Sequence, residues 1–144
     1  MMDRTRRYRR LLAVNRSLEQ VRSSALRRSQ REREHASAAL DEARRALAEA
    51  LGWRDGCRTG ADLLLWHEYT EALTARVRHR GDRLAAAETA LEMERSRMQE
   101  AHREVKRWEL AVEAQVRLEH AATNARRARE LEDHIQRAAG RREG

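Results

Sequence analysis

The sequence predicts an all-α fold in which two long helices form an antiparallel coiled-coil hairpin, and three observations support this prediction. Proline is absent from all 144 residues. Ala, Arg, Glu and Leu dominate the composition, and these residues favour helices along nearly the whole chain. Charged residues make up 38% of the chain and aromatic residues 3%, so apolar bulk is too scarce for a compact two-layer core. A long, thin structure needs less apolar bulk.

The first helix is expected at about residues 3–51, with Asp3 or Thr5 as its N-cap. Its apolar residues recur at alternating steps of three and four in two sets. The first set is Leu11, Val14, Leu18, Val21 and Ala25, and the second is Leu40, Ala43, Leu47 and Ala50. The two sets do not share one heptad frame, so we expect a stutter between residues 25 and 36. The polar stretch 27–35 predicts local unwinding or loose packing.

A turn is expected at about residues 52–61, because Gly52, Gly56 and Gly60 recur there and glycine permits positive φ angles. The second, longer helix should follow at about residues 62–139, with Thr59 or Asp62 as its cap. The whole chain, residues 1–144, is expected to form a single helical-hairpin domain.

The second helix carries a heptad repeat. Six apolar residues follow one another at intervals of seven: Val77, Leu84, Leu91, Met98, Val105 and Val112. Ala87, Ala101 and Trp108 supply the alternate positions, with Arg80 and Glu94 as polar exceptions. Such a repeat indicates a left-handed supercoil with a partner helix, and the first helix is the nearest candidate.

If both helices leave the turn together, the first helix ends beside about residues 105–110. The second helix would then continue alone as a C-terminal overhang, residues 111–139. One side of this overhang is apolar: Val112, Leu118, Ala121, Ala125, Ala128, Leu131 and Ile135. An unpartnered amphipathic helix is typical of a docking element.

The formal net charge is +7, and it is concentrated at the N-terminal end. Residues 1–33 hold eleven arginines against three acidic residues. A basic patch favours an acidic protein surface, nucleic acid or anionic lipid, and charge alone does not choose among them. Only Tyr8 interleaves with the arginines, which is a sparse aromatic complement for nucleic-acid binding. A protein-docking end and a merely solvated end are the other interpretations.

Nothing in the sequence indicates an enzyme, a cofactor or a metal centre. The pairs His67 with Glu71 and Glu130 with His134 are isolated, which favours slight helix support over metal binding. Cys57 is the only cysteine and has no catalytic base beside it, so we interpret it as a bystander thiol. We expect no export signal, no membrane insertion and a cytoplasmic location.

The aromatic residues Trp53, Trp66 and Tyr69 gather at the turn with several leucines. They indicate either a partner site or a hydrophobic plug that locks the turn, and both interpretations stay open. Trp108 is expected in the core near Tyr8 and Leu11.

Three segments carry a family resemblance: Ala-Arg-Arg-Ala-Leu-Ala-Glu-Ala-Leu at 43–51, Trp-His-Glu-Tyr-Thr-Glu-Ala-Leu at 66–73 and Glu-Val-Lys-Arg-Trp-Glu-Leu at 104–110. An Arg/Glu/Ala-rich tail follows through residue 132. With the length and the basic start, they make most of the chain resemble the FliJ/YscO proteins of bacterial flagellar and type III secretion systems.

The resemblance implies a central stalk, not an enzyme, that stands in the pore of the hexameric secretion ATPase. It also implies contact with the cytoplasmic domain of the export gate, at the cytoplasmic face of the inner membrane, and with substrate chaperones in some members. The ATPase-docking residues would be Arg4, Arg6, Arg7, Arg9, Arg10, Leu118, Arg126, Arg127, Leu131 and Ile135. The export-gate or chaperone contacts would be Leu47, Leu51, Trp53, Trp66, Tyr69 and Leu73.

Two other classes of function stay open. One is a structural coiled coil that self-associates through the overhang. The other is a basic helical hairpin that binds nucleic acid, although no nucleic-acid partner is expected under the family resemblance.

Overall fold

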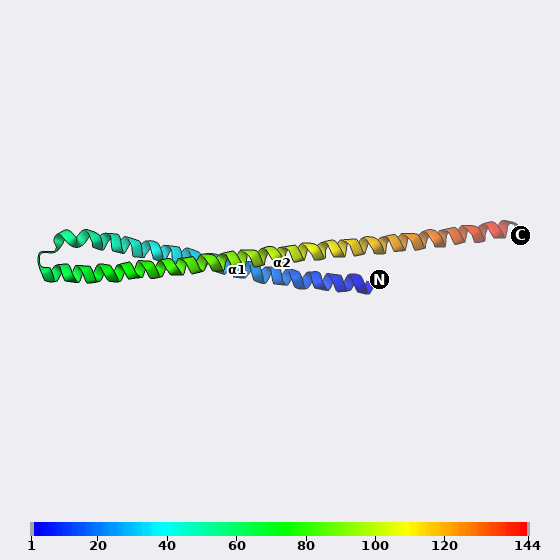
Figure 1. The fold of residues 1–144 in the computed structure, drawn as a ribbon. Coiled ribbons are helices and arrows are strands. Elements are labelled where there is room, and N and C mark those ends of the chain that lie inside the picture. Colours follow the sequence, from blue (N-terminus) through cyan, green and yellow to red (C-terminus); the bar gives the residue numbers. More distant parts are fainter. Residues whose placement is uncertain (1, 144) are drawn as a thin grey trace. The chain divides into compact units, whose positions relative to one another are not determined.

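The computed structural model describes residues 2–143 and contains two long helices. Helix α1 is Met2–Gly52, a short 3-10 helix η1 is Trp53–Gly56, and helix α2 is Gly60–Glu143 (Figure 1). No strand occurs among the described residues. The prediction of an all-α hairpin is therefore confirmed.

The chain divides into two compact units, each built from a segment of α1 antiparallel to a segment of α2. Unit 1 comprises Met1–Gln20 and Glu100–Gly144, and unit 2 comprises Val21–Gln99, which includes the turn. The sequence-based expectation of one domain stays a prediction.

The helices run slightly further than the sequence predicts. Helix α1 gains one residue at each end of the expected range, and α2 begins two residues earlier and ends four residues later. Asp3 lies in the first turn of α1 and not at its cap. Thr5 is buried within the helix, where its hydroxyl donates a hydrogen bond to Glu119, so it is not a cap either.

The start of α2 is fixed by a capping box in which both predicted caps take part. Thr59 Oγ1 accepts a hydrogen bond from Asp62 N at 3.1 Å, and Asp62 Oδ2 accepts one from Thr59 N at 3.3 Å. The same carboxylate accepts from Arg58 N at 3.2 Å. Because these bonds satisfy backbone groups that have no partner within the helix, they define where α2 begins.

The turn glycines do not supply the backbone freedom that the sequence suggested. No described glycine has a positive φ, and Gly52 ends α1 at φ −69° and ψ −17°. The reversal is made by η1 and an extended Cys57, conformations that other residues adopt as readily. The expectation of positive φ angles at the turn is therefore wrong.

The heptad repeat of α2 is confirmed by burial. In both units the buried and half-buried positions of α2 follow alternating steps of four and three. In unit 2 they are Trp66, Thr70, Leu73, Val77, Arg80, Leu84, Ala87, Leu91, Glu94 and Met98. In unit 1 they are Ala101, Val105, Trp108, Val112, Gln115, Glu119 and Ala122. We call these positions, with their counterparts on α1, the seam.

The first apolar set predicted for α1 does not lie in the seam. Val14, Leu18 and Val21 are 56%, 52% and 62% exposed. The seam instead uses Thr5, Tyr8, Leu12, Asn15 and Glu19 in unit 1, and Leu26, Ser29, Ala36, Leu40, Ala43, Leu47 and Ala50 in unit 2.

All of these α1 positions fit one heptad frame, so the predicted stutter is wrong. The frame of the set at 40–50 extends back through the helix, and exposed Arg22 and Arg33 occupy its two remaining positions. The predicted unwinding at residues 27–35 is also wrong, because α1 is continuous there. The packing beside this stretch is open, however, and a groove of about 840 Å³ lies next to it.

The predicted overhang begins too early. In unit 1, Thr5 of α1 contacts Glu119, and the seam of α2 continues to Ala122. All residues of α2 from 124 to 143 are exposed, so the unpaired part starts well after residue 111 (Figure 1). The error arises at the turn. Trp66 donates a hydrogen bond to Ala50, so the first six residues of α2 lie beyond the last seam residue of α1. The paired part of α2 therefore begins and ends later in the sequence than predicted.

Candidate protein-binding surfaces

Large apolar side chains are exposed around the turn of unit 2. We call this set the turn surface: Leu51, Trp53, Leu63, Leu64, Leu65 and Tyr69. Three of them, Leu63, Leu64 and Leu65, belong to the first turns of α2, before the seam begins at Trp66. An exposed cluster of large apolar and aromatic side chains is typical of a protein-binding surface.

Trp53 and Tyr69 form the centre of the turn surface. Their rings are stacked, with centroids 5.9 Å apart and planes 7° from parallel. Trp53 is 51% and Tyr69 48% exposed. Because each ring restrains the other while half of its area stays open, the pair offers a rigid aromatic platform to a partner.

Trp66 performs the plug role that the sequence left open. Its Nε1 donates a hydrogen bond to the carbonyl oxygen of Ala50 at 2.7 Å, which satisfies a backbone group near the C-terminus of α1. The guanidinium carbon of Arg54 lies 5.9 Å from the centroid of the Trp66 ring. The aromatic cluster therefore divides: Trp66 closes the turn, and Trp53 with Tyr69 faces outward.

The predicted gate-contact residues divide in the same way. Leu51, Trp53 and Tyr69 are exposed, whereas Leu73 is buried and Leu47 and Trp66 are half-buried in the seam. Leu63, Leu64 and Leu65 were not among the predicted contact residues. Their signal was available: three consecutive leucines at the start of a helix cannot all lie on one stripe.

In unit 1, the arginines of α1 lie on two sides of the helix. Arg6, Arg9 and Arg10 line a groove of about 420 Å³ together with Thr5, Ala13 and Glu119. Arg4 and Arg7 are exposed elsewhere, on a stripe that continues at steps of four and three through Leu11, Val14 and Leu18. The second stripe thus combines positive charge with accessible apolar area.

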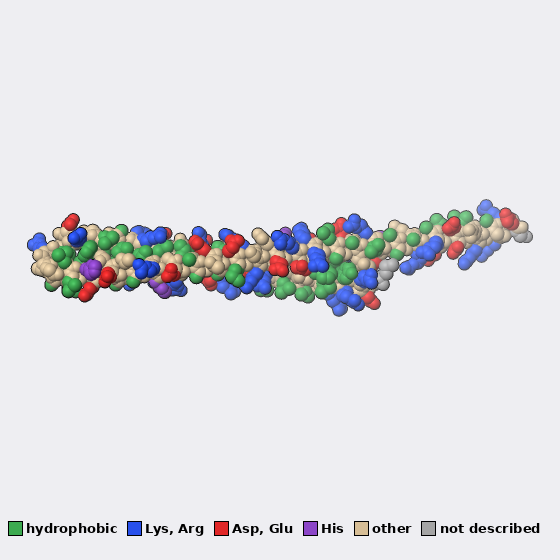
Figure 2. All heavy atoms as spheres, viewed as in Figure 1, with side chains coloured by type: hydrophobic (Ala, Val, Ile, Leu, Met, Phe, Trp, Pro, Cys, Tyr) green, Lys and Arg blue, Asp and Glu red, His purple; other side chains and the backbone are tan. Residues whose placement is uncertain are grey.

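The C-terminal part of α2 carries the other predicted docking residues. Leu118, Leu131 and Ile135 are all exposed large apolar side chains, and Arg126 and Arg127 are exposed between them. Figure 2 shows apolar side chains and basic side chains along the visible face of this part of the helix. Every residue predicted to dock on an ATPase is therefore accessible.

The unit 1 seam contains the aromatic contact that the sequence predicted. Tyr8 and Trp108 pack edge to face, with ring centroids 5.7 Å apart and planes at 64°. Both side chains are half-buried. This contact packs the α1 segment against α2 in unit 1.

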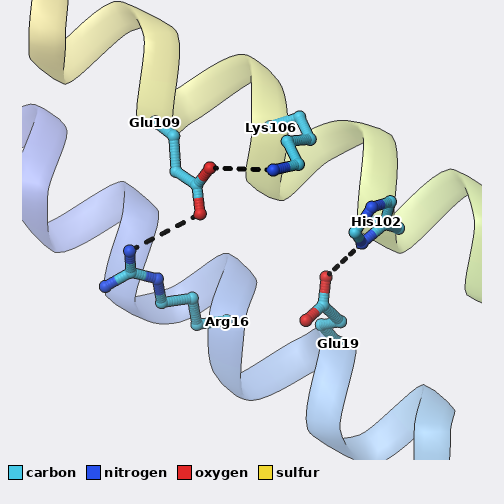
Figure 3. A network of polar contacts seen from close by, with 5 residues as sticks. All are labelled: Arg16, Glu19, His102, Lys106 and Glu109. Atoms are coloured by element: carbon cyan, nitrogen blue, oxygen red, sulfur yellow. Dashed lines mark hydrogen bonds and ion pairs between the residues drawn. The ribbon is translucent and has the colours of Figure 1, made fainter.

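A polar network borders the unit 1 seam and was not expected from the sequence (Figure 3). Glu109 lies 3.6 Å from Arg16 Nη2 and 3.6 Å from Lys106 Nζ through its two oxygens. Glu19 Oε2 lies 3.2 Å from His102 Nδ1. All five side chains are partly exposed, so the network adds modestly to stability and more to the choice of register.

The candidate metal ligands within residues 2–143 are the histidines, the cysteine and the carboxylates. No group of three or more His, Cys, Asp or Glu side chains there could hold a metal ion. His67 Nε2 and Glu71 form an exposed i,i+4 pair at 3.6 Å, which gives slight helix support as predicted. The Cys57 thiol lies 3.9 Å from the carbonyl oxygen of Trp53 and 3.8 Å from that of Asp62.

Neither described helix has a stretch that is long and apolar enough to cross a membrane. Comparisons with protein families, curated proteins and solved structures find no match to this chain.

Proposed function

We propose that this protein is a non-enzymatic stalk that couples a hexameric secretion ATPase to an export gate in a flagellar or injectisome type III secretion apparatus. The observation that carries the proposal is the chemical difference between the two units. Unit 1 exposes arginines and leucines, whereas the turn of unit 2 exposes a stacked aromatic pair among leucines. Two unlike surfaces suit two different partners.

Unit 1 supports the ATPase half of the proposal. Arg6, Arg9 and Arg10 line one groove, and arginine forms strong, directional hydrogen bonds with carboxylates and carbonyl groups of a partner. Every residue of α2 from 124 to 143 is exposed, and such a helix is stabilised mainly by burying its apolar side chains against a partner. Enclosure in a ring pore would bury Leu131 and Ile135.

The turn surface supports the gate half of the proposal. Aromatic side chains concentrate binding energy in protein interfaces, and Trp53 and Tyr69 are already held in place by each other. The partner would be the cytoplasmic domain of the export gate, at the cytoplasmic face of the inner membrane. Substrate chaperones are a further partner for the same surface.

The ATPase half is tested by measuring the activity of the purified cognate secretion ATPase with increasing amounts of the full chain. We expect stimulation by the native protein and a large loss of stimulation by Arg6→Glu/Arg9→Glu/Arg10→Glu. The matched control, Arg44→Glu/Arg76→Glu/Arg78→Glu, changes three exposed arginines outside unit 1 and outside the seam, and alters net charge equally.

Equal losses in the two triple variants would show that only total charge matters, and no stimulation by the native protein would reject the ATPase partner.

The gate half is tested by measuring binding of the full chain to the purified cytoplasmic domain of the gate. Trp53→Ala/Tyr69→Ala removes the exposed pair, and we expect about thirty-fold weaker binding with unchanged helix content by circular dichroism. Trp66→Ala removes the plug, and we expect a lower melting temperature with less direct effect on affinity. The opposite pattern would assign Trp66 to the partner and the stacked pair to the turn.

Self-association is the second candidate function, and the exposed apolar stripe of α1 favours it. Val14 and Leu18 are more than half exposed, and with half-buried Leu11 they have heptad-like spacing. Sedimentation equilibrium over a wide concentration range tests this candidate. A mass that rises to that of a dimer, and that returns to the monomer value in Val14→Lys/Leu18→Lys, would favour the structural coiled coil over the stalk.

A further inference from the structure

A groove lies along one side of unit 2, beside the polar middle of α1. It encloses about 840 Å³ and is lined by residues between 28 and 39 of α1 and between 80 and 90 of α2. Twelve residues of helix measure about 17 Å, so the groove extends over about three helical turns. Neither the turn surface nor the docking residues of unit 1 contribute to it.

The floor of the groove is made of alanines: Ala36, Ala39, Ala86, Ala87 and Ala90. An alanine floor has no side chain beyond Cβ, so another helix could lie close against both α1 and α2. Helix axes approach to about 8 Å where the contacting residues are small. A furrow of this length and floor fits a third helix better than it fits a compact small molecule.

The walls of the groove are basic. Arg28, Arg31, Arg80 and Arg83 line it, against a single acidic residue, Glu32. None of these four arginines takes part in an ion pair or a side-chain hydrogen bond within residues 2–143. Arg33, on the same stretch of α1, does pair with a carboxylate: its Nε lies 3.9 Å from Glu88 Oε1. The groove therefore presents positive charge that the chain itself leaves uncompensated.

We propose that this groove binds an acidic amphipathic helix of a partner protein. The apolar stripe of that helix packs on the alanine floor, and its carboxylates pair with the arginines on both walls. A second copy of this chain does not fit the role, because it is itself basic, with 31 Lys and Arg against 24 Asp and Glu and a net charge of +7. Nucleic acid fits less well, because the lining holds a single aromatic ring, that of His35, and no Trp, Tyr or Phe on which successive bases could stack.

The binding site is independent of the proposed stalk function, since it uses neither the ATPase-docking nor the gate-contact residues. Its occupant would be held at the middle of the hairpin segment in unit 2. Because the walls belong to α1 and α2 together, binding would also hold the two helices together beside Ser29 and Arg80, two polar positions in the seam of unit 2.

The experiment uses the full chain and a fluorescein-labelled helical peptide of about 21 residues, with leucine and alanine on one face and glutamate on both flanks. Fluorescence anisotropy at low salt measures its affinity. A second peptide, with glutamine in place of every glutamate, is the charge control. We expect the acidic peptide to bind, with affinity falling as salt is raised, and the glutamine peptide to bind at least tenfold more weakly.

Two groove variants locate the binding. Arg28→Glu/Arg83→Glu reverses one charge on each wall, and Ala86→Trp fills the floor; each should weaken binding at least tenfold. Their matched controls are Arg44→Glu/Arg76→Glu and Ala75→Trp, which change exposed residues of unit 2 outside the groove. We expect these controls to bind within about twofold of the native chain. Circular dichroism should show equal helix content in all of them.

Three outcomes would overturn the proposal. The first is no measurable binding of the acidic peptide. The second is equal loss in the groove variants and their controls, which would indicate attraction to net charge alone. The third is a DNA oligonucleotide that competes with the peptide and loses affinity in Arg28→Glu/Arg83→Glu but not in Ala86→Trp, because phosphates would then be the natural occupant of the walls.

Discussion

The two units join α1 to α2 through seams of different composition, and the seam of unit 1 is the more polar one. Near the turn, the seam of unit 2 buries apolar residues such as Leu40, Ala43 and Leu73. The seam of unit 1 contains buried Thr5 and Gln115, while leucines such as Leu18 and Leu118 are exposed. Away from the turn surface, unit 2 thus places more apolar side chains in its seam than unit 1 does.

Because of this difference, we expect unit 2 to be stable by itself and unit 1 to gain stability from a partner. Burying apolar area is the main favourable term in helix packing, and a polar seam gains less of it. Polar residues in a seam act instead on specificity, because a misaligned register leaves them without partners. Unit 1 is therefore expected to be the less stable unit in isolation and the one that binding stabilises most.

The largest expected effect comes from placing a carboxylate either in the seam of unit 2 or on the exposed stripe of unit 1. Leu73→Asp buries an unpaired carboxylate at a position that is only 3% exposed, and should destabilise unit 2 by roughly 3–5 kcal/mol. Leu18→Asp makes the same change on the open stripe of unit 1 and should cost less than about 0.5 kcal/mol. Thermal unfolding followed by circular dichroism measures both.

A large loss from Leu18→Asp in the monomer would show that the stripe is packed after all, and would remove the contrast between the units.

The next effect tests whether the polar seam limits the stability of unit 1. Gln115→Leu places an apolar side chain at a buried seam position with similar helix propensity, and should stabilise unit 1 by about 1–2 kcal/mol. Amide hydrogen exchange of residues 2–20 and 100–123 reports the gain. Ala114→Leu adds a leucine at the neighbouring exposed position and should leave exchange nearly unchanged.

Slower exchange in both variants would mean that apolar area stabilises unit 1 wherever it is added, as expected if the chain already self-associates.

A smaller effect concerns two glycines inside α2. A Cβ at Gly81 or Gly140 would meet no atom within 4 Å, and neither has a positive φ. Gly81→Ala in unit 2 should therefore stabilise the protein by about 0.5–1 kcal/mol through helix propensity. Gly140→Ala lies near the end of an unpacked helix and should raise helix content without raising the melting temperature. A destabilised Gly81→Ala variant would indicate a contact that requires glycine there.

The heptad frame of α2 was predictable from the sequence because its seam residues are mostly apolar on one stripe. The frame of α1 was not, for a physical reason. In the N-terminal part of α1, the seam holds Thr5, Asn15 and Glu19, while a better apolar repeat occupies the neighbouring stripe. Hydrophobic periodicity therefore selected the wrong face. The correct face is found by extending the heptad frame of residues 40–50 back along α1, because this single frame continues to Thr5.

The candidate surfaces were predictable in composition but not in exposure. Their aromatic and basic residues are visible in the sequence. Which tryptophan packs in the turn and which stays exposed depends on which ring reaches Ala50, and that ring is Trp66. The basic groove was missed because its two walls lie about fifty residues apart in the chain. Only the register of the hairpin brings Arg28 and Arg83 to one furrow.

The smallest effect concerns the ion pairs that border the two seams. Glu109→Gln removes the contacts to Arg16 and Lys106 in unit 1, and Glu88→Gln removes the contact to Arg33 in unit 2. All of these side chains are more than a third exposed, so each change should cost less than about 1 kcal/mol at low salt. The loss should be larger in unit 1, because Glu109 serves two cations and its seam is less apolar. In about 1 M NaCl, where the screening length is roughly 3 Å, both losses should nearly vanish. A difference between the variants that persists at high salt would mean that Glu109 acts through packing in the seam, and the polar network would then be part of what holds unit 1 together.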